Sequence, residues 1–376
     1  MPAVLTESET LVVELEGGGI SRRDFLAFCA SLTATLALPS VFSERIAHAL
    51  EASDKPALIW LEFQDCAGNT ESFLRAHNPG VAEIILDILS VDYHETIMAA
   101  AGTQAEAAKE AALEAGGHIV IVEGSVPTAD GGVYCTIAGK TAVQHLEEAA
   151  RDAAAIINVG SCSSFGGIPA ASPNPTGARG VPDVVKNVPI INLPGCPMNV
   201  DNLLGVIAHF LTFGSLPPTD EQGRPLFAYG QRIHDNCERR AHFDAGQFAL
   251  EWGDEGHRKG WCLYKLGCKG PSTFHNCPSI RWNMGTNWPI GAGHGCVGCS
   301  EADFWDTMSP FYERLPKPPG FGVTTTADQI GLAVVGATAV GFGAHGIAKV
   351  IQHRRGADRT EENIPAPGDQ EKGGDA

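Results

Sequence analysis

At 376 residues the chain is long enough for two domains with hydrophobic cores, and its 44% hydrophobic content excludes a largely disordered protein. A formal net charge of −18 argues against nucleic-acid binding, because a protein that grips phosphates needs a basic face. Eleven cysteines are too sparse for a disulfide scaffold in a chain of this length, and their clustering with a histidine indicates metal ligation instead.

The N-terminal segment, residues 1–49, has the order of a twin-arginine export signal. Arg22 and Arg23 precede the apolar run AFCASLTATLALPSVF, and Ala47-His48-Ala49 follows as a small-x-small cleavage site. This leader predicts export of a folded protein, with cytoplasmic location as the alternative. An ordinary amphipathic or buried helix with two chance arginines is the competing interpretation, and the acidic residues before Ser21 favour it.

From residue 56 to residue 220, strand-like and helical patterns alternate. The predicted strands lie in ALIWLEF, EIILDILSVDY, HIVIVEGSVP, IINVGSCSSFGG and VPIINLPGCP, and the end of IINVGSCSSFGG is predicted to be a glycine-rich loop. The predicted helices lie in EAAKEAALEAGG, HLEEAARDAAA and NVDNLLGVIAHFLTFG. The alternation predicts an α/β doubly wound parallel sheet, whose cofactors bind outside the carboxyl ends of the strands. Cys66, Cys162 and Cys196 each fall at such an end.

After the boundary PPTDEQGRP, residues 221–320 are rich in glycine and proline and carry few long apolar runs. Side-chain burial alone could not fold such a segment, so bound metal must hold it. The segment contains seven soft ligands: His234, Cys237, Cys262, Cys268, Cys277, Cys296 and Cys299.

Zinc and iron–sulfur clusters both accept these spacings. A Cys₃His zinc site could use His234, Cys237, Cys262 and Cys268, but the remaining three cysteines are one short of a structural zinc site. A 3Fe-4S cluster needs three cysteines, so the count favours iron–sulfur clusters.

The first domain offers a third group, formed by Cys66, Cys162 and Cys196. A fourth ligand could be Asp65, whose carboxylate binds iron better than the neutral amide of Asn69 does. The alternative is a cluster that has no fourth ligand from the protein.

Near the C-terminus, residues 330–348 contain no Asp, Glu, Lys or Arg, and Lys349, Arg354 and Arg355 follow them. Residues 327–351 are therefore predicted to form a hydrophobic helix that either spans a membrane or packs on a partner protein through its small residues. The polar tail, residues 352–376, is predicted to be disordered.

Seven motifs in order resemble those of one family, the small subunits of NiFe uptake hydrogenases. They are WLEFQDCAGNTESFL, EGSVPTADGGVYC, GSCSSFGGIPAASPNPTGA, NLPGCP, HDNC, GWCLYKLGCKGPSTFHNCP and WPIGAGHGCVGCSE. The resemblance implies a flavodoxin-like domain followed by an irregular iron–sulfur domain, with two 4Fe-4S clusters and one 3Fe-4S cluster. It also implies that H₂ is split at a NiFe centre in a separate large subunit.

The resemblance assigns the ligands by position. The implied ligands are Cys66, Cys162 and Cys196 for the proximal 4Fe-4S cluster, Cys277, Cys296 and Cys299 for the medial 3Fe-4S cluster, and His234, Cys237, Cys262 and Cys268 for the distal 4Fe-4S cluster. Pro289 stands where a fourth medial cysteine would occur. Electrons would pass from the proximal to the distal cluster and on to a membrane acceptor, a cytochrome b or a quinone-linked protein, in a dimer of heterodimers.

One departure from the family pattern concerns the first motif. Asn69 stands where the family usually has the second proximal cysteine, and Gly68 and Gly167 stand where the oxygen-tolerant membrane-bound members have extra cysteines. The pattern resembles the high-affinity actinobacterial-type branch, whose proximal cluster takes one aspartate, here Asp65. Oxygen tolerance would then need another route than a six-cysteine cluster. A hydrogen-sensing relative and a zinc-stabilised binding module are the alternative functions.

Overall fold

The computed structural model describes residues 21–51, 56–77, 80–85, 89–315 and 327–361. The chain up to Phe243, together with Gln247 to Gly322, forms one compact unit, and Asp244–Gly246 with Val323–Ala376 forms a second. The residues before Ser21 and after Glu361, which include parts of the predicted leader and tail, lie outside the described residues. The predicted boundary between residues 220 and 221 falls inside the first unit and stays a prediction.

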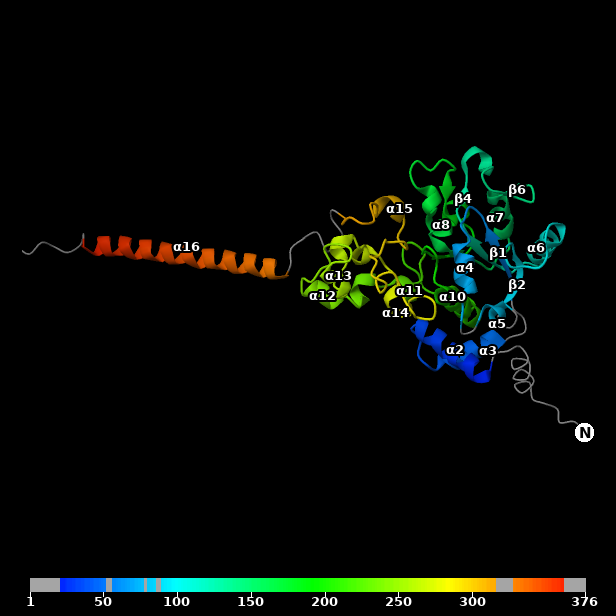
Figure 1. The fold of residues 1–376 in the computed structure, drawn as a ribbon, viewed down its shortest axis with the longest axis horizontal. Coiled ribbons are helices and arrows are strands. Elements are labelled where there is room, and N and C mark those ends of the chain that lie inside the picture. Colours follow the sequence, from blue (N-terminus) through cyan, green and yellow to red (C-terminus); the bar gives the residue numbers. More distant parts are fainter. Residues whose placement is uncertain (1–20, 52–55, 78–79, 86–88, 316–326, 362–376) are drawn as a thin grey trace, which may run out of the picture. The chain divides into compact units, whose positions relative to one another are not determined.

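A five-stranded parallel sheet with the order β2-β1-β3-β7-β9 lies at the centre of the first unit (Figure 1). Its strands are β1 (Ala57–Glu62), β2 (Ser90–His94), β3 (Ile119–Glu123), β7 (Ala155–Val159) and β9 (Ile190–Leu193). Every neighbouring pair runs parallel. This strand order is that of flavodoxin-like sheets, so the predicted fold class is confirmed.

Helices cover both faces of the sheet. Successive residues of β1 point to opposite faces, so Leu58 and Trp60 join one hydrophobic core while Ile59 and Leu61 join the other. The first core includes α4 (Gly68–Leu74) and α10 (Val200–Phe213), and the second includes α6 (Thr103–Ala115) and α7 (Ala142–Ala150). Burial on both faces explains why the strands read as continuous apolar runs.

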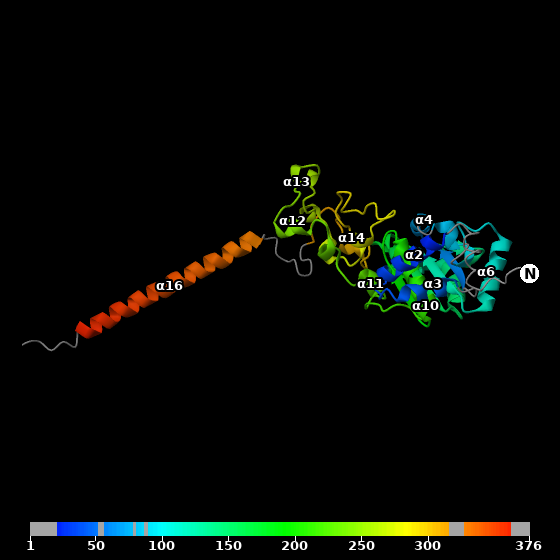
Figure 2. The ribbon, with the colours of Figure 1, turned by 90° about the horizontal axis from the view of Figure 1, so that it is seen from below.

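The leader segment folds as α2 (Arg22–Thr35) and α3 (Phe42–Glu51), which pack beside α10 in both ribbon views (Figures 1 and 2). Their apolar side chains belong to the first core, with Cys29 and Ile46 fully buried. This arrangement is the buried helix of the competing interpretation. In this arrangement Ala47 of the cleavage motif is buried inside α3. The export signal therefore stays a prediction.

Two local predictions differ from the structure. The strand expected in EIILDILSVDY begins only at Ser90, after a helical turn that includes α5 (Val81–Glu83) and buries Ile84. An apolar run without alternation does not distinguish a strand from a buried helix. The glycine-rich loop expected after β7 starts instead as a short helix, α8 (Gly160–Phe165), whose Ser164 hydroxyl donates to the Gly160 carbonyl at 2.8 Å.

Residues 221–315 contain only short helices among the described elements, none longer than the five residues of α12. These helices are α11 (Leu226–Tyr229), η4 (Ile233–Asn236), α12 (Arg240–Asp244), α13 (Glu255–Arg258), η5 (Tyr264–Leu266), η6 (Gly270–Ser272), α14 (Cys277–Ile280) and α15 (Phe304–Thr307). The remaining elements of the first unit are β4 (Val126–Pro127), η2 (Ala129–Gly132), β5 (Thr136–Ile137), β6 (Lys140–Thr141), η3 (Ile168–Ala170), β8 (Ala178–Arg179) and α9 (Val181–Val184). The predicted irregular second half is therefore observed.

In the second unit, α16 (Ala327–Glu361) extends beyond Ile351, where the hydrophobic helix was predicted to end. Residues Leu332–Arg354 are long and apolar enough to cross a membrane, with a mean hydropathy of 1.5 and no burial within the structure. By length and composition this segment suits either a membrane span or a helix packed on a partner protein.

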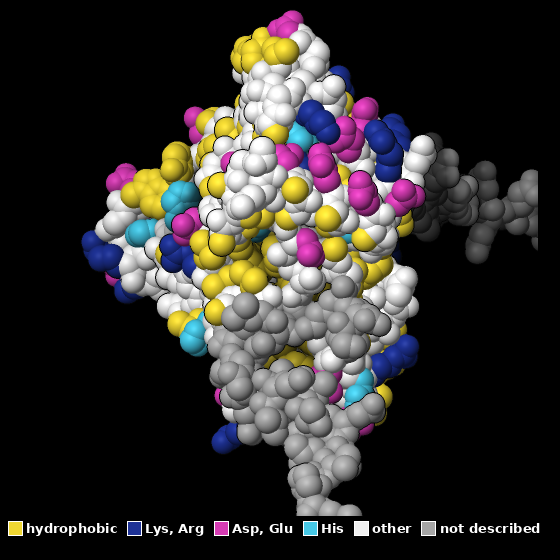
Figure 3. All heavy atoms as spheres, turned by 90° about the vertical axis from the view of Figure 1, so that its right-hand side faces the viewer, with side chains coloured by type: hydrophobic (Ala, Val, Ile, Leu, Met, Phe, Trp, Pro, Cys, Tyr) yellow, Lys and Arg dark blue, Asp and Glu magenta, His cyan; other side chains and the backbone are white. Residues whose placement is uncertain are grey.

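Figure 3 shows the surface at the end of the flavodoxin-like domain that lies at the right in Figure 1. On the coloured part of this face, Lys and Arg side chains lie among Asp and Glu side chains and form no continuous basic surface. Such an interspersed surface lacks the electrostatic footprint that a phosphate backbone requires.

Candidate metal centres

The proximal group forms where three parallel strands end. Cys66 follows β1, Cys162 lies in α8 after β7, and Cys196 follows β9. Two hydrogen bonds join the last two loops: the Ser161 N–H donates to the Gly195 carbonyl at 2.9 Å, and the Gly195 N–H donates to the Ser161 hydroxyl at 3.0 Å. Burial raises the pKa of the Cys162 thiol to about 12, with further contributions from Cys196 and Cys66. The structure thus brings these three cysteines together, as predicted.

Glu123, the last residue of β3, fixes the loop that carries Cys66. Its fully buried carboxylate accepts hydrogen bonds from the backbone N–H groups of Asn69 at 2.8 Å and Thr70 at 3.0 Å, in the first turn of α4. The Thr70 hydroxyl (2.7 Å), the Asn69 amide (3.3 Å) and the Trp60 indole (3.3 Å) also donate to it. A carboxylate at a helix N-terminus is electrostatically favourable. The sequence pattern gave Glu123 no role, and only its position at a strand end marked it.

The structure gives different surroundings to the two candidates for the fourth proximal ligand. The Asn69 amide is buried and hydrogen-bonded at both ends: its NH₂ group donates to Glu123, and its oxygen accepts from the Met198 N–H at 2.8 Å. Asp65 is exposed and accepts one hydrogen bond, from the Ala67 N–H at 3.2 Å. Its carboxylate lies close to those of Glu62 and Glu123, and partial desolvation by the surrounding protein together with the negative charge of Glu123 raises its pKa to about 6.

The medial group lines a cavity of about 330 Å³ in the irregular half of the chain. Cys277, Cys296 and Cys299 contribute to its wall, and Pro289 lines the same cavity. Most of the lining is apolar, and Cys277 and Cys296 are buried. Burial raises the pKa of the Cys299 thiol to about 11 and also raises the pKa values of the Cys277 and Cys296 thiols.

The distal group draws its residues from η4 and from the loop around η5. His234 lies in η4 and is buried, and Cys237 follows at its end. Burial raises the pKa of Cys262 to about 12, and the nearby Cys268 and Cys237 add to the shift. The Arg239 N–H donates to the Cys237 sulfur at 3.4 Å. The four predicted distal residues therefore converge on one region.

The three groups lie next to one another in series. Cys196 of the proximal group lines the medial cavity together with Cys299, and the two cysteines are electrostatically coupled. At the other end, the Cys296 N–H donates to the Cys268 sulfur at 3.3 Å. A proximal cysteine thus lies beside a medial one, and a medial cysteine contacts a distal one.

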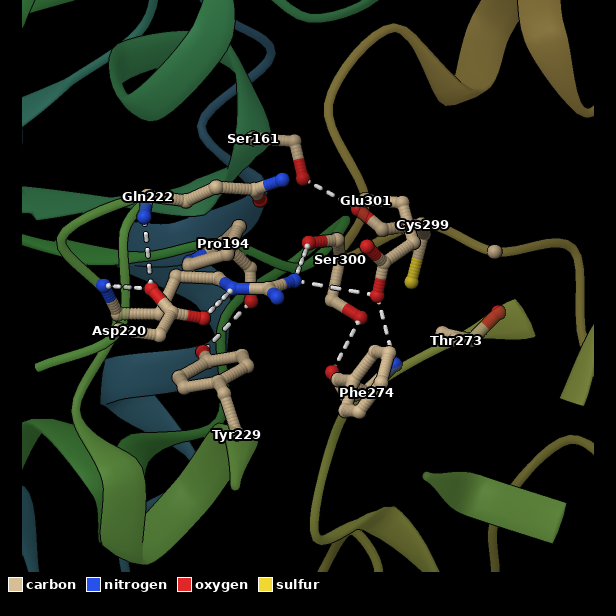
Figure 4. Close-up of polar contacts among 12 residues, drawn as sticks. Ser161, Pro194, Asp220, Gln222, Tyr229, Thr273, Phe274, Cys299, Ser300 and Glu301 are labelled. Carbon is tan, nitrogen blue, oxygen red and sulfur yellow. Dashed lines mark hydrogen bonds and ion pairs between the residues drawn. The ribbon is translucent and has the colours of Figure 1, made fainter. Parts of the chain in front are cut away.

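A buried polar network holds the flavodoxin-like half against the irregular half (Figure 4). Arg224, 4% exposed, donates to Asp220 at 2.8 Å, to Glu301 at 3.1 Å and to the Ser300 carbonyl at 3.0 Å. In the same view, Tyr229 donates to the Pro194 carbonyl at 2.7 Å and Ser161 donates to the Cys299 carbonyl. The network therefore links the loops of the proximal cysteines to the loop that carries Cys299.

The donor set fits a thiolate-bound metal better than it fits free thiols. All eleven cysteines lie in the described residues, and none forms a disulfide. Burial raises the pKa of each of the grouped thiols for which a shift is resolved, so without a cation they would be protonated and would line apolar space. A metal supplies the positive charge that stabilises the thiolates.

Comparison with known proteins agrees with this geometry. Residues 229–312 match the family model of the C-terminal region of the NiFe/NiFeSe hydrogenase small subunit, and residues 66–210 match that of the NADH ubiquinone oxidoreductase 20 Kd subunit. The chain is 49% identical over 347 residues to the quinone-reactive Ni/Fe-hydrogenase small chain of Wolinella succinogenes, covering 90% of this chain and 98% of that one. The chain belongs to the NiFe hydrogenase small-subunit family.

Two solved structures extend the comparison for this hydrogenase small subunit. The NiFeSe hydrogenase of Desulfomicrobium baculatum is similar with a TM-score of 0.66 and 36% identity, over 69% of this chain and 100% of that chain. The actinobacterial-type NiFe-hydrogenase of Ralstonia eutropha H16 has a TM-score of 0.66 at 23% identity, over 84% of this chain and 94% of that chain. The second likeness shows a shared fold, and the assignment to that branch stays a prediction.

Proposed function

We propose that this hydrogenase small subunit transfers electrons from H₂ oxidation in a partner large subunit through three iron–sulfur sites to a respiratory acceptor. The observation that carries the proposal is that Cys196 lies beside Cys299 and that Cys296 contacts Cys268. Tunnelling falls steeply with distance, so a relay needs short gaps between neighbouring sites. Only Cys29 and Cys135 lie outside the three groups, too few to hold a NiFe centre, so H₂ chemistry belongs to the large subunit.

The proposed ligands follow the three groups. Cys66, Cys162 and Cys196 with Asp65 would hold the proximal 4Fe-4S cluster, Cys277, Cys296 and Cys299 the medial 3Fe-4S cluster, and His234, Cys237, Cys262 and Cys268 the distal 4Fe-4S cluster. When bound, these clusters take up and release single electrons. The wall around the buried Cys277 and Cys296 is largely apolar, and an apolar surrounding helps to set the potential of a bound cluster.

We choose Asp65 as the fourth proximal ligand because its carboxylate accepts one hydrogen bond, whereas the Asn69 amide is already held by two buried partners. The amide of Asn69 already bonds Glu123 and Met198, and a ligand role would leave two buried partners without it. Asp65 is exposed and repelled by Glu123, so a bound iron ion would relieve that repulsion.

An exposed apolar side chain beside the proximal group supports contact with a large subunit. Ile168 is 51% exposed and follows α8, the helix that carries Cys162. Exposed aliphatic side chains next to a functional site are typical of interface cores. Burying Ile168 against a large subunit would shield the electron entry point from water.

The membrane side of the proposal rests on α16 and on the relatives. The relative from Wolinella succinogenes is named quinone-reactive, which supports a quinone-linked acceptor. Export through the twin-arginine signal, a membrane-bound location at the exported face, oxygen tolerance and a dimer of heterodimers are further parts of the proposal.

Metal and sulfide analysis of the purified heterodimer tests the cluster assignment. The proposal expects acid-labile sulfide in an amount matching two 4Fe-4S clusters and one 3Fe-4S cluster per chain, and iron in an amount matching these clusters and the one iron of the NiFe centre. Cys296→Ser should lower both, whereas the control Cys135→Ser, at a half-buried thiol outside the three groups, should leave them unchanged. Two or more zinc ions per chain with no sulfide would overturn the proposal in favour of a zinc-stabilised module.

A further inference from the structure

Lys269 occupies the position between the medial and distal groups. It follows Cys268 directly in the chain, and its backbone N–H donates to the Cys296 carbonyl at 2.7 Å. Its side chain is 2% exposed and ranks among the largest fully buried side chains. The lysine is thus attached through its backbone to one cysteine of each group.

The ammonium group of Lys269 is held by neutral partners. Its Nζ donates to the backbone carbonyls of Pro310, at 3.2 Å, and Glu313. Within the described part of the chain it forms no ion pair with a carboxylate. Arg224 differs, because two carboxylates, those of Asp220 and Glu301, offset its charge.

A buried cation without an anionic partner is unfavourable, since it has lost its hydration. The anionic groups that would offset this charge are above all the thiolates of Cys268 and Cys296, both of which are electrostatically coupled to Lys269, with the Glu313 carboxylate a smaller influence. A fixed positive charge beside a redox centre favours the state with one more electron, because reduction adds negative charge.

We propose that Lys269 is a positioning residue whose buried positive charge raises the reduction potentials of the medial and distal clusters together. This inference rests on the proposed function, because it requires clusters at these two groups. A cation shared by the two groups shifts both potentials in the same direction, so a change at this one side chain should be seen at both clusters.

A purely structural role is the competing explanation. The loop around Lys269 packs closely on the chain at residues 311–313, since a Cβ at Gly267 would lie 2.5 Å from the Tyr312 carbonyl carbon. The hydrogen bonds from Lys269 to Pro310 and Glu313 could simply fasten this segment. A measurement of potential separates the two roles, because fastening alone does not move it.

The test is an EPR-monitored redox titration of the heterodimer with three variants. Lys269→Gln keeps N–H donors for the two carbonyls but removes the charge, Lys269→Met removes both, and Lys269→Arg keeps the charge. We expect the Gln and Met variants to lower the medial and distal potentials together, with the proximal potential shifted much less. Lys269→Arg should restore both potentials toward the wild-type values.

Arg239→Gln is the matched control. Arg239 is also buried, and its backbone N–H contacts Cys237 of the distal group only. This change should therefore lower the distal potential and leave the medial one in place.

Unchanged medial and distal potentials in a fully loaded Lys269→Gln protein would overturn the inference and leave the proposed function standing. Loss of clusters in both neutral variants, with retention in Lys269→Arg, would assign Lys269 a structural role and overturn it as well. Absence of iron and sulfide from the wild-type heterodimer would instead refute the proposed function itself.

Discussion

Replacing Glu123 with glutamine should destabilise the loop that carries Cys66. Five donors converge on the two carboxylate oxygens of Glu123, among them the backbone N–H groups of Asn69 and Thr70. A glutamine offers one oxygen and one NH₂ group. In one orientation the NH₂ group faces the backbone and side-chain N–H groups of Asn69. In the other orientation it faces the Thr70 backbone N–H and the Trp60 indole N–H. Either way, two buried N–H donors lose their acceptor.

The expected cost follows from these contacts. Each buried donor left without an acceptor costs about 1–3 kcal/mol, and two of them give about 4 kcal/mol. Loss of the negative charge at the N-terminus of α4 adds about 0.5 kcal/mol. For a protein of this size the sum corresponds to a melting temperature lowered by about 10 °C.

Thermal unfolding of the heterodimer, with iron content measured in parallel, provides the assay. Glu71→Gln is the control, because Glu71 lies on the same helix but is exposed and pairs with Arg75 at 3.5 Å. An exposed pair of this kind contributes about 0.5 kcal/mol or less. If Glu123→Gln and Glu71→Gln lower the melting temperature equally, the account of how this loop is held is wrong.

Three further outcomes are expected. Asp65→Ala should change the EPR signal of the proximal cluster and leave the 3Fe-4S signal intact, and an unchanged spectrum would remove Asp65 as a ligand. Pro289→Cys, at the wall of the medial cavity, should convert the 3Fe-4S cluster to 4Fe-4S, so persistence of an oxidised 3Fe-4S signal would contradict this placement. Burial raises the pKa of the Cys162 and Cys262 thiols to about 12, so protons compete with iron for these sulfurs. Iron loss to a chelator should therefore become faster as the pH falls from about 8 to about 6. A rate of iron loss that does not depend on pH would contradict this reasoning.

The sheet and the grouping of ligands could be predicted from the sequence because both follow local rules. Continuous apolar runs such as ALIWLEF mark strands buried on both faces, and parallel strands place Cys66, Cys162 and Cys196 at one edge. The spacing of the remaining ligands in a segment without long apolar runs likewise indicated metal sites.

The polar contacts that support the sites could not be predicted in the same way. Arg224 finds Glu301 and Lys269 finds Pro310 across long stretches of chain, and nothing in the local sequence marks these pairs. Short apolar runs were also ambiguous, since Ile84 is buried from a helical turn although its sequence resembles a strand.

The N-terminal helices show how a local pattern can fit two structures. The apolar run after Arg23 suits an export signal, yet Leu32 and Ile46 are buried in the core beside α10. Export with cleavage after Ala49 would require α3 to leave that position. Fractionation of a tagged chain with Arg22 and Arg23 replaced by lysine tests export: retention in the cytoplasm supports the signal, and unchanged location contradicts it.

EPR spectroscopy of the heterodimer before and after exposure to H₂ tests the relay most directly. The account predicts that H₂ abolishes the 3Fe-4S signal of the oxidised protein, and that an electron acceptor restores it. A 3Fe-4S signal that persists under H₂ in a heterodimer with an active NiFe centre would contradict electron flow through the medial group of this chain.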